Sequence, residues 1–348
     1  MKVIKGMGDY FSLDIGTRSI RVVQLSAASE HRWKLEGVGY SALDEQIIAS
    51  PSPENRKKLM SAILATVTQA GIKAKNVAVG LPSSKTFTTV IEVPMMSDVE
   101  LKSTLKYQID QYIPMSLDDA KVDWAKLGPS PRDEKKQEVL LASTAQSYVE
   151  ELVELIDGAG LNVIAAEPDP IAIIRALLPA NVTGAHMVLD VGEQSTDVAV
   201  TMGDRPVLVR TLPMGLETMV SAIVQNLTIK EEQASQFLLK FGLAQDRLEG
   251  QVFRAVEGTL DGFASEIAKS IKFFQGKYAA EAPIEVHLSG YAGAIPQFKE
   301  FIATKTALPT DIVSPWRNVD VAEADRGKIQ STEYEFATAV GLAQRVGK

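Results

Sequence analysis

A six-residue motif occurs twice in this sequence, once in each half of the chain. The first copy is Asp14-Ile-Gly-Thr-Arg-Ser19, and the second is Asp190-Val-Gly-Glu-Gln-Ser195. Apolar and β-branched runs flank both copies, and turn-forming residues separate the runs, so each copy predicts the tip of a β-hairpin. Because Asp, Gly and Ser recur at matching places, the sequence predicts two domains that present the same hairpin.

The residue types at each tip suit the binding of a polyphosphate together with a metal ion. A glycine has no Cβ and tolerates positive φ, so backbone N–H groups can approach an oxyanion, and the serine hydroxyl can add a donor. The aspartate cannot bind phosphate, but it can hold a hydrated Mg²⁺ ion. The alternative is that Asp-x-Gly forms only a tight turn. The repetition favours a Mg²⁺ and polyphosphate site, with Asp14 and Asp190 at the metal.

Composition excludes several classes of protein. The 348 residues carry a net charge of −8, which argues against a nucleic-acid binder. There is no cysteine, hence no disulfide or thiolate site, and the three histidines, His31, His186 and His287, lie far apart in the sequence and receive no role. No segment has the pattern of a signal peptide or of a membrane-spanning helix, so we expect a cytoplasmic protein that meets the membrane only indirectly.

The hydrophobic pattern predicts alternating strands and helices in three regions. The first region, 1–81 with 143–184 and a C-terminal helix 334–348, contains a β-β-β-α-β run. The segment 82–142 reads as an inserted β-α-β-β module with a helix at 101–112. The region 185–333 forms a second domain with strands at 190–201, 207–212 and 284–288 and a helical insert at 215–280. In its helix 256–278, an apolar stripe is expected to face the core: Leu260, Phe263, Ile267, Ile271 and Phe274.

This order of elements resembles the actin-like ATPases, and its details are similar to the PilM family of type IV pilus assembly proteins. The stretches that carry the closer resemblance are Ile91-Glu-Val-Pro-Met-Met-Ser97 and Tyr107-Gln-Ile-Asp-Gln-Tyr-Ile-Pro114. The resemblance extends over essentially the whole chain. It implies an α/β, actin-like fold of two duplicated ribonuclease H-like domains, with an inserted subdomain as in FtsA and PilM.

The resemblance also implies ATP and Mg²⁺ as cofactors and at most a slow ATPase activity. Asp14 and Asp190 would position the metal, and Glu167 would orient the attacking water, although it can also be read as an acidic residue at a helix N-terminus. Tyr291 replaces a family glycine, and Ser235 and Leu238 depart from a family helix motif, which places the adenosine contacts in question. The residues expected to contact the nucleotide are Gly16, Thr17, Arg18, Ser19, Gly192, Glu193, Gln194, Ser195, Thr196, Gly215, Gly290, Tyr291 and Gly293.

The partner implied by the resemblance is the N-terminal cytoplasmic peptide of the membrane protein PilN, together with the pilus motor and platform proteins. Self-association is a further possibility. We expect the peptide to bind between the inserted module and the first domain, with Tyr107 and Tyr112 as anchors and Leu105 and Ile113 lining its pockets. The alternatives are an FtsA-like division protein and an ATP-hydrolysing or sugar-kinase-like enzyme, for which Asp169 is a weak candidate base. The inserted module favours the adaptor, because it has no use in binding a sugar.

Overall fold

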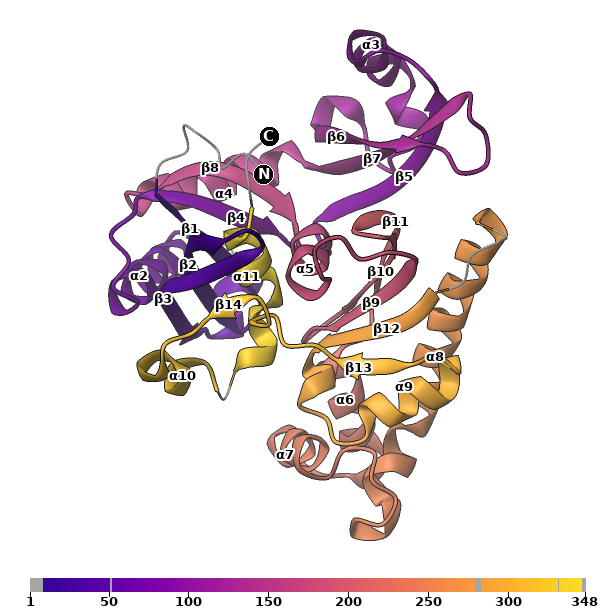
Figure 1. Cartoon of the computed structure of the whole chain (residues 1–348). Coiled ribbons are helices and arrows are strands. Elements are labelled where there is room, and N and C mark those ends of the chain that lie inside the picture. The colour runs from indigo at the N-terminus through magenta and orange to yellow at the C-terminus, as the bar shows by residue number, and fades with distance from the viewer. Residues whose placement is uncertain (1–8, 51, 279–282, 331, 346–348) are drawn as a thin grey trace. The chain divides into compact units, whose positions relative to one another are not determined.

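The computed structural model divides into two compact units, residues 1–176 with 315–348 and residues 177–314 (Figure 1). It describes residues 9–50, 52–278, 283–330 and 332–345, without the side chains of 106–109. Each unit contains a sheet covered by helices, as the alternating pattern of strands and helices predicts.

Six strands form the main sheet of the first unit, within the residues described. Their order is β14-β3-β2-β1-β4-β8. Helix α2 (Pro53–Gln69) begins at Ser52, whose hydroxyl accepts a hydrogen bond from the Asn55 N–H at 3.1 Å. It packs with α4 (Gln146–Gly158) on a core that includes Phe11 and Leu13, while α11 (Ala337–Ala343) contacts β1, β2 and β4. The strands are β1 (Tyr10–Ile15), β2 (Ser19–Ser29), β3 (Arg32–Ala42), β4 (Asn76–Leu81), β8 (Asn162–Pro168) and β14 (Val319–Asp320).

The inserted module of the first unit has a small sheet of its own. Strands β5 (Thr86–Pro94), β7 (Lys136–Ala145) and β6 (Ala120–Pro129) form it in the order β5-β7-β6, with antiparallel pairing throughout. Helix α3 (Asp98–Gln108) buries Leu101 and Leu105 against Val139 and Leu141 of β7. This arrangement confirms the predicted β-α-β-β order.

The second unit repeats the strand order of the first. Its sheet runs β11-β10-β9-β12-β13, which matches β3-β2-β1-β4-β8 strand for strand. The core side carries the predicted stripe of α8 (Gln251–Lys277), with Leu260, Phe263, Ile267 and Phe274 buried and Ile271 partly buried. The other elements are β9 (Ala185–Val191), β10 (Thr196–Met202), β11 (Arg205–Leu212), β12 (Pro283–Gly290), β13 (Thr310–Ile312), α6 (Leu216–Leu227), α7 (Glu231–Phe241) and α9 (Phe298–Thr306).

Several boundaries differ from those expected. The predicted strand 190–201 contains the hairpin turn and belongs to two strands, β9 and β10. Residues 315–333, expected in the second domain, lie in the first unit, because β14 pairs with β3 and Trp316 packs on Phe336 with ring centroids 5.3 Å apart. The elements that the pattern did not predict are the short ones: α1 (Glu45–Ala49), α10 (Glu323–Ile329), β13 and β14. Helix α5 spans Asp169–Leu177.

Candidate functional site

The two hairpin tips have the same backbone geometry. In the first tip, the Gly16 N–H donates to the Ser19 carbonyl at 2.9 Å. In the second, the Gly192 N–H donates to the Ser195 carbonyl at 2.8 Å. The predicted repetition is therefore confirmed at the level of single hydrogen bonds.

The residues opposite the two aspartates differ in charge. Asp14 pairs across its hairpin with Arg21, whereas Asp190 pairs at the same position with Asp197. The Asp197 carboxylate accepts a hydrogen bond from the Thr211 hydroxyl at 2.9 Å. One tip therefore carries a cation beside its aspartate, and the other tip carries a second acid.

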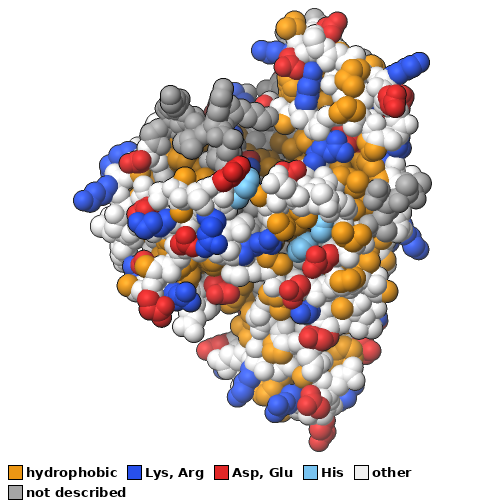
Figure 2. Space-filling view, viewed as in Figure 1, with side chains coloured by type: hydrophobic (Ala, Val, Ile, Leu, Met, Phe, Trp, Pro, Cys, Tyr) orange, Lys and Arg blue, Asp and Glu red, His pale blue; other side chains and the backbone are white. Residues whose placement is uncertain are grey.

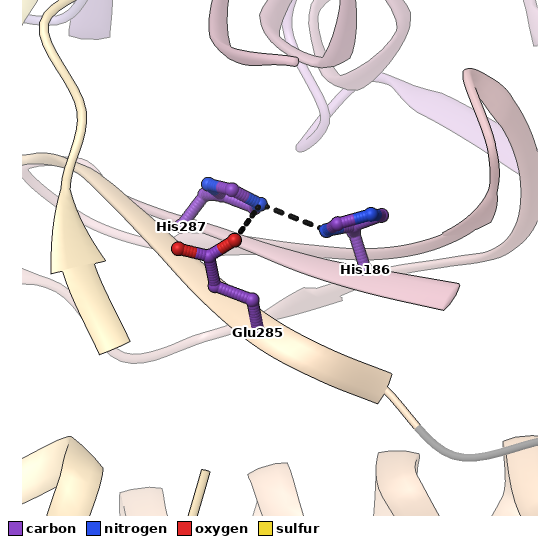
Figure 3. Close-up of side chains that lie close together, drawn as sticks. All are labelled: His186, Glu285 and His287. Atoms are coloured by element: carbon purple, nitrogen blue, oxygen red, sulfur yellow. Dashed lines mark hydrogen bonds and ion pairs between the residues drawn. The ribbon is translucent and has the colours of Figure 1, made fainter. Parts of the chain in front are cut away.

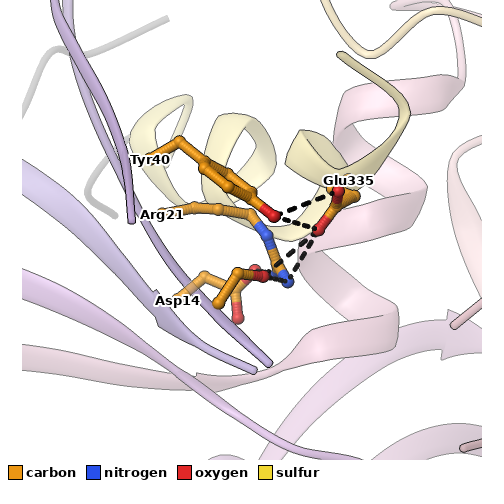
Figure 4. A network of polar contacts seen from close by, with 5 residues as sticks. Asp14, Arg21, Tyr40 and Glu335 are labelled. Atoms are coloured by element: carbon orange, nitrogen blue, oxygen red, sulfur yellow. Dashed lines mark hydrogen bonds and ion pairs between the residues drawn. The ribbon is translucent and has the colours of Figure 1, made fainter. Parts of the chain in front are cut away.

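Arg21 is the centre of a polar network at the first tip (Figure 4). Its guanidinium donates to the Asp14 carboxylate and, at 2.6 Å, to the Ser19 hydroxyl. It also lies 3.6 Å from the Glu335 carboxylate, which accepts hydrogen bonds from Ser19 at 3.2 Å and from the Tyr40 hydroxyl at 3.4 Å. Glu335 comes from the C-terminal segment just before α11, so the network joins the two ends of the chain.

Burial acts in opposite directions on the two kinds of charge in this network. Burial by itself lowers the pKa of Arg21, but the carboxylates of Asp14 and Glu335 outweigh that effect and raise the pKa above its ordinary value. The pKa of Glu335 is raised, because its burial outweighs the attraction of Arg21. The guanidinium stays charged, and Glu335 ionises less readily than an ordinary glutamate.

Arg21 also lies close to Gly16. A Cβ on Gly16 would lie 2.7 Å from Arg21 Nη2, so a larger residue at this position would displace the guanidinium from its place over the tip. Arg21 was not among the residues predicted to bind the nucleotide. A signal was available in the sequence, because hairpin pairing around the tip places position 21 directly opposite Asp14. A metal ion on Asp14 would require this guanidinium to move, so that role stays a prediction.

The second tip lies against the start of helix α6. The N–H groups of Leu216 and Glu217 donate to the carbonyls of Gly192 and Glu193 at 3.0 and 2.9 Å. A Cβ on Gly215 would lie 2.5 Å from the Glu193 carbonyl oxygen, so the contact requires a glycine there. The Thr196 hydroxyl donates to the Met214 carbonyl at 2.7 Å. In the structure, Gly215 therefore allows the start of α6 to lie close to the second tip.

Strand β12 brings a third predicted segment to the second tip. Ser289 and Gly290 pair with Asp190 and Val191 of β9, and Gly290 has a φ of +65°, where a Cβ would lie 2.2 Å from the Val191 carbonyl oxygen. One end of this sheet therefore collects Asp190 and the predicted glycines 192, 215 and 290, with the exposed Gly293 just beyond.

The departures from the family pattern have structural counterparts in the second unit. The Tyr291 ring is partly buried and packs against the core, and Leu238 is fully buried in the same core. Ser235 is half-buried on α7 beside Leu238. These positions serve packing in this chain.

Glu167 forms a bidentate salt bridge with Arg175. Its carboxylate accepts from both terminal nitrogens of Arg175, at 2.7 and 2.8 Å, and Arg175 also donates to the Gly341 carbonyl at 2.7 Å. Burial lowers the pKa of Arg175, but the contact with Glu167 raises it above its ordinary value. The predicted water-orienting role of Glu167 would require this pair to open.

The residues expected to contact a partner peptide lie in different environments. Leu105 and Ile113 are 3% and 6% exposed in the core of the inserted module, and Tyr112 is partly buried against that core. The Tyr107 side chain is outside the described residues. Among the module's described side chains, the large hydrophobic ones that are exposed are Met95 and Val99, at 51% and 82%, and Figure 2 shows hydrophobic side chains at the surface in this part of the chain. A partner role for Leu105 or Ile113 would require the core to open.

Within the residues that the structure describes, no helix is both long enough and apolar enough to cross a membrane.

Comparison with known proteins identifies one family over nearly the whole chain. Residues 12–346 match the family described as type IV pilus assembly protein PilM. The structure resembles a PilM–PilN type IV pilus biogenesis complex, with 22% identity, a TM-score of 0.82 and coverage of 97% of this chain and 98% of that chain.

More distant structures share the fold. The ethanolamine utilization protein EutJ from Carboxydothermus hydrogenoformans matches with 15% identity, a TM-score of 0.55 and coverage of 96% and 88%. MreB5 of Spiroplasma citri, solved with AMPPNP bound, matches with 10% identity, a TM-score of 0.54 and coverage of 95% and 94%. The predicted actin-like fold is therefore confirmed.

Proposed function

The chain belongs to the family of type IV pilus assembly proteins PilM, and from this premise we propose that it is an ATP-binding adaptor for the N-terminal cytoplasmic peptide of the membrane protein PilN. It would lie at the inner face of the cytoplasmic membrane and link PilN to the pilus motor. The observation that carries the proposal is the family match over residues 12–346, which includes the inserted module. That match does not favour an FtsA-like or a sugar-kinase-like role.

The peptide would bind through the inserted module. Two features support this: the exposed apolar side chains of Met95 and Val99, and the edge strands β5 and β6, which pair only with β7 among the described strands. An extended peptide can add its backbone to such an edge while its apolar side chains contact the exposed ones nearby. Tyr112, partly buried at the module core, is the best placed of the predicted anchors.

Titration of a labelled peptide with the N-terminal sequence of PilN, followed by fluorescence anisotropy, tests this function. Val99→Asp and Tyr112→Ala should each weaken binding by about 1 to 2 kcal/mol, or roughly 5- to 30-fold. Lys102→Ala, at an exposed position of the same helix, is the matched control and should bind like the wild type. Thermal unfolding of Tyr112→Ala shows whether a loss of binding comes from the missing side chain or from unfolding of the protein.

Two outcomes would end this proposal. If the wild type does not bind the peptide, the chain is not an adaptor for PilN. If both variants bind with full affinity, the peptide binds elsewhere on the chain.

ATP with Mg²⁺ would bind at the hairpin tips. The residues present fit such a ligand in part: both tips have the permissive glycine turn, and Arg21 supplies a cation at the first. Bound Mg²⁺ would offset the charge of the phosphate oxygens. Because Asp14 pairs with Arg21, the guanidinium would have to turn from the carboxylate towards the phosphates. With Glu167 held by Arg175, hydrolysis is expected to be slow.

Calorimetric titration with ATP and Mg²⁺ tests the nucleotide site. Asp14→Ala and Asp190→Ala should each abolish binding, because each removes the carboxylate of one tip. Asp204→Ala is the control, since this exposed residue follows β10 at the strand end away from the tip. A wild type that takes up no nucleotide at millimolar concentration, or an Asp190→Ala protein with normal affinity, would show that the tips are structural.

A further inference from the structure

Two histidines and a glutamate that are far apart in the sequence meet in the second unit. Strand β9 carries His186, and the adjacent parallel strand β12 carries Glu285 and His287 on one face, with Glu285 paired to His186. One ligand atom from each residue lies within 4.8 Å of the others (Figure 3). The two rings point towards one another and the glutamate turns towards them, so three metal-ligating groups converge.

The spacing of these atoms matches a metal coordination sphere. His186 Nδ1 is 3.1 Å from His287 Nε2, and His287 Nε2 is 3.6 Å from Glu285 Oε2. Around Zn²⁺, with bonds of about 2.0 to 2.1 Å, tetrahedral ligands lie roughly 3.3 to 3.4 Å apart. These two distances fall on either side of that value, and all three ligand atoms lie within 4.8 Å of one another, so an adjustment of the side chains would satisfy it.

A contact with a backbone carbonyl determines which nitrogen of His186 is unprotonated and directs its lone pair towards the cluster. His186 Nε2 lies 2.9 Å from the Thr183 carbonyl oxygen, which can only accept, so Nε2 carries the proton. In the neutral ring Nδ1 is then the unprotonated nitrogen, and it points at His287. Histidines that ligate metals are commonly oriented in this way, by donating the other ring N–H to a carbonyl.

Burial and position leave one side of the cluster open. Both histidines are 5% exposed, whereas the Glu285 side chain is 40% exposed and lets solvent reach the site. The cluster lies at the beginning of β9 and β12, and Asp190 and Gly290 lie at their other ends. It is therefore separate from the predicted nucleotide site.

We propose that His186 Nδ1, His287 Nε2 and the Glu285 carboxylate bind one divalent transition-metal ion, with Zn²⁺ as the preferred ion and water in the fourth position. Two imidazoles and one carboxylate suit zinc and its neighbours in the first transition series, whereas Mg²⁺ takes oxygen ligands. The ion ties the beginning of β9 to that of β12 and stabilises the second unit. Without a metal, the same rings form a simple hydrogen-bonded pair.

The test uses the full-length, untagged protein after removal of metal with a chelator. Zn²⁺ affinity is measured by competition with a chromophoric chelator, and Co²⁺ absorption reports the ligand geometry. We expect one ion per chain and a higher melting temperature with Zn²⁺. Glu285→Gln should weaken binding at least tenfold, and His287→Asn should lose it.

His31→Asn is the matched control, because His31 is the histidine outside the cluster. It has a φ of +59°, a conformation that asparagine tolerates, and should bind Zn²⁺ like the wild type. If His287→Asn fails to fold, Glu285→Gln decides, since its side chain is half-exposed. A wild type without Zn²⁺ uptake, or a folded Glu285→Gln with unchanged affinity and Co²⁺ spectrum, would leave only the hydrogen-bonded pair.

Discussion

Arg21 is a single guanidinium placed against two carboxylates, those of Asp14 and Glu335. The closer of the two is Asp14, and Glu335 is attracted mainly by Arg21 at 3.6 Å and accepts further hydrogen bonds from Ser19 and Tyr40. Burial is the largest effect on the pKa of Glu335 and raises it. At the scale of residues, burial therefore resists the ionisation of Glu335 although a guanidinium lies nearby.

The raised pKa of Glu335 predicts how the stability of the protein depends on pH. Folded Glu335 retains its proton at pH values where the unfolded chain, with an ordinary glutamate pKa of about 4.3, has released it. The free energy of unfolding therefore falls as pH rises from that value through the raised pKa. Glu335→Gln should match the wild type near pH 4 and exceed its stability at pH 8.

Urea unfolding at several pH values measures this effect. Glu333→Gln, at an exposed position two residues earlier, is the control and should leave the pH profile unchanged. Parallel profiles for the wild type and Glu335→Gln would contradict the argument.

Helix α11 illustrates, at the scale of elements, how packing overrides helix propensity. It approaches α5 so closely that a Cβ on Gly341 would lie 1.9 Å from the Ala172 carbonyl oxygen. The Gly341 carbonyl accepts from Arg175, and the Tyr10 hydroxyl donates to the carbonyls of Ala343 and Arg345 at 2.9 and 2.8 Å. Burial raises the pKa of Tyr10 to about 12, in keeping with a hydroxyl held at this helix end.

The same substitution in two helices should therefore have opposite effects. Gly341→Ala should destabilise the protein by about 1 to 3 kcal/mol or more, because the methyl group collides with the backbone of α5. Gly258→Ala, at an exposed position of α8 with no atom within 4 Å of the added Cβ, should stabilise it by roughly 0.5 to 1 kcal/mol. Chemical denaturation of both variants gives the two values. If both substitutions stabilise the protein, or both destabilise it, then helix propensity alone or packing alone governs the two sites.

Charge is the property of the whole molecule that bears on its location. The chain carries a net charge of −8, and the face in Figure 2 mixes acidic and basic side chains without one dominant sign. A net negative charge is repelled by the anionic lipids of the cytoplasmic leaflet. Recruitment to a membrane would then depend on the proposed partner.

Co-sedimentation with vesicles tests this dependence. We expect the protein to remain in the supernatant with anionic vesicles alone and to pellet with vesicles that display the PilN N-terminal peptide. Val99→Asp should reduce the pelleted fraction in the second case only. Pelleting with anionic vesicles that carry no peptide would show a direct lipid contact.

The sequence by itself determined the repeated hairpins, the order of the main elements and the inserted module. These features depend on local patterns, such as glycines at tight turns, alternation in strands and the helical stripe of α8. The boundaries within 190–201 and the short edge strands were not determined, because they depend on pairing with distant strands.

Only the tertiary structure decided which charged groups meet. Arg21 meets Glu335 from the other end of the chain, Glu167 is held by Arg175, and His186 meets His287 across adjacent strands. No repeat or spacing in the sequence indicates these contacts. How the strands and helices pack sets the distance between the side chains in each of them. A charge or a ring nitrogen acts over a few ångströms, so its function depends on neighbours that only folding supplies.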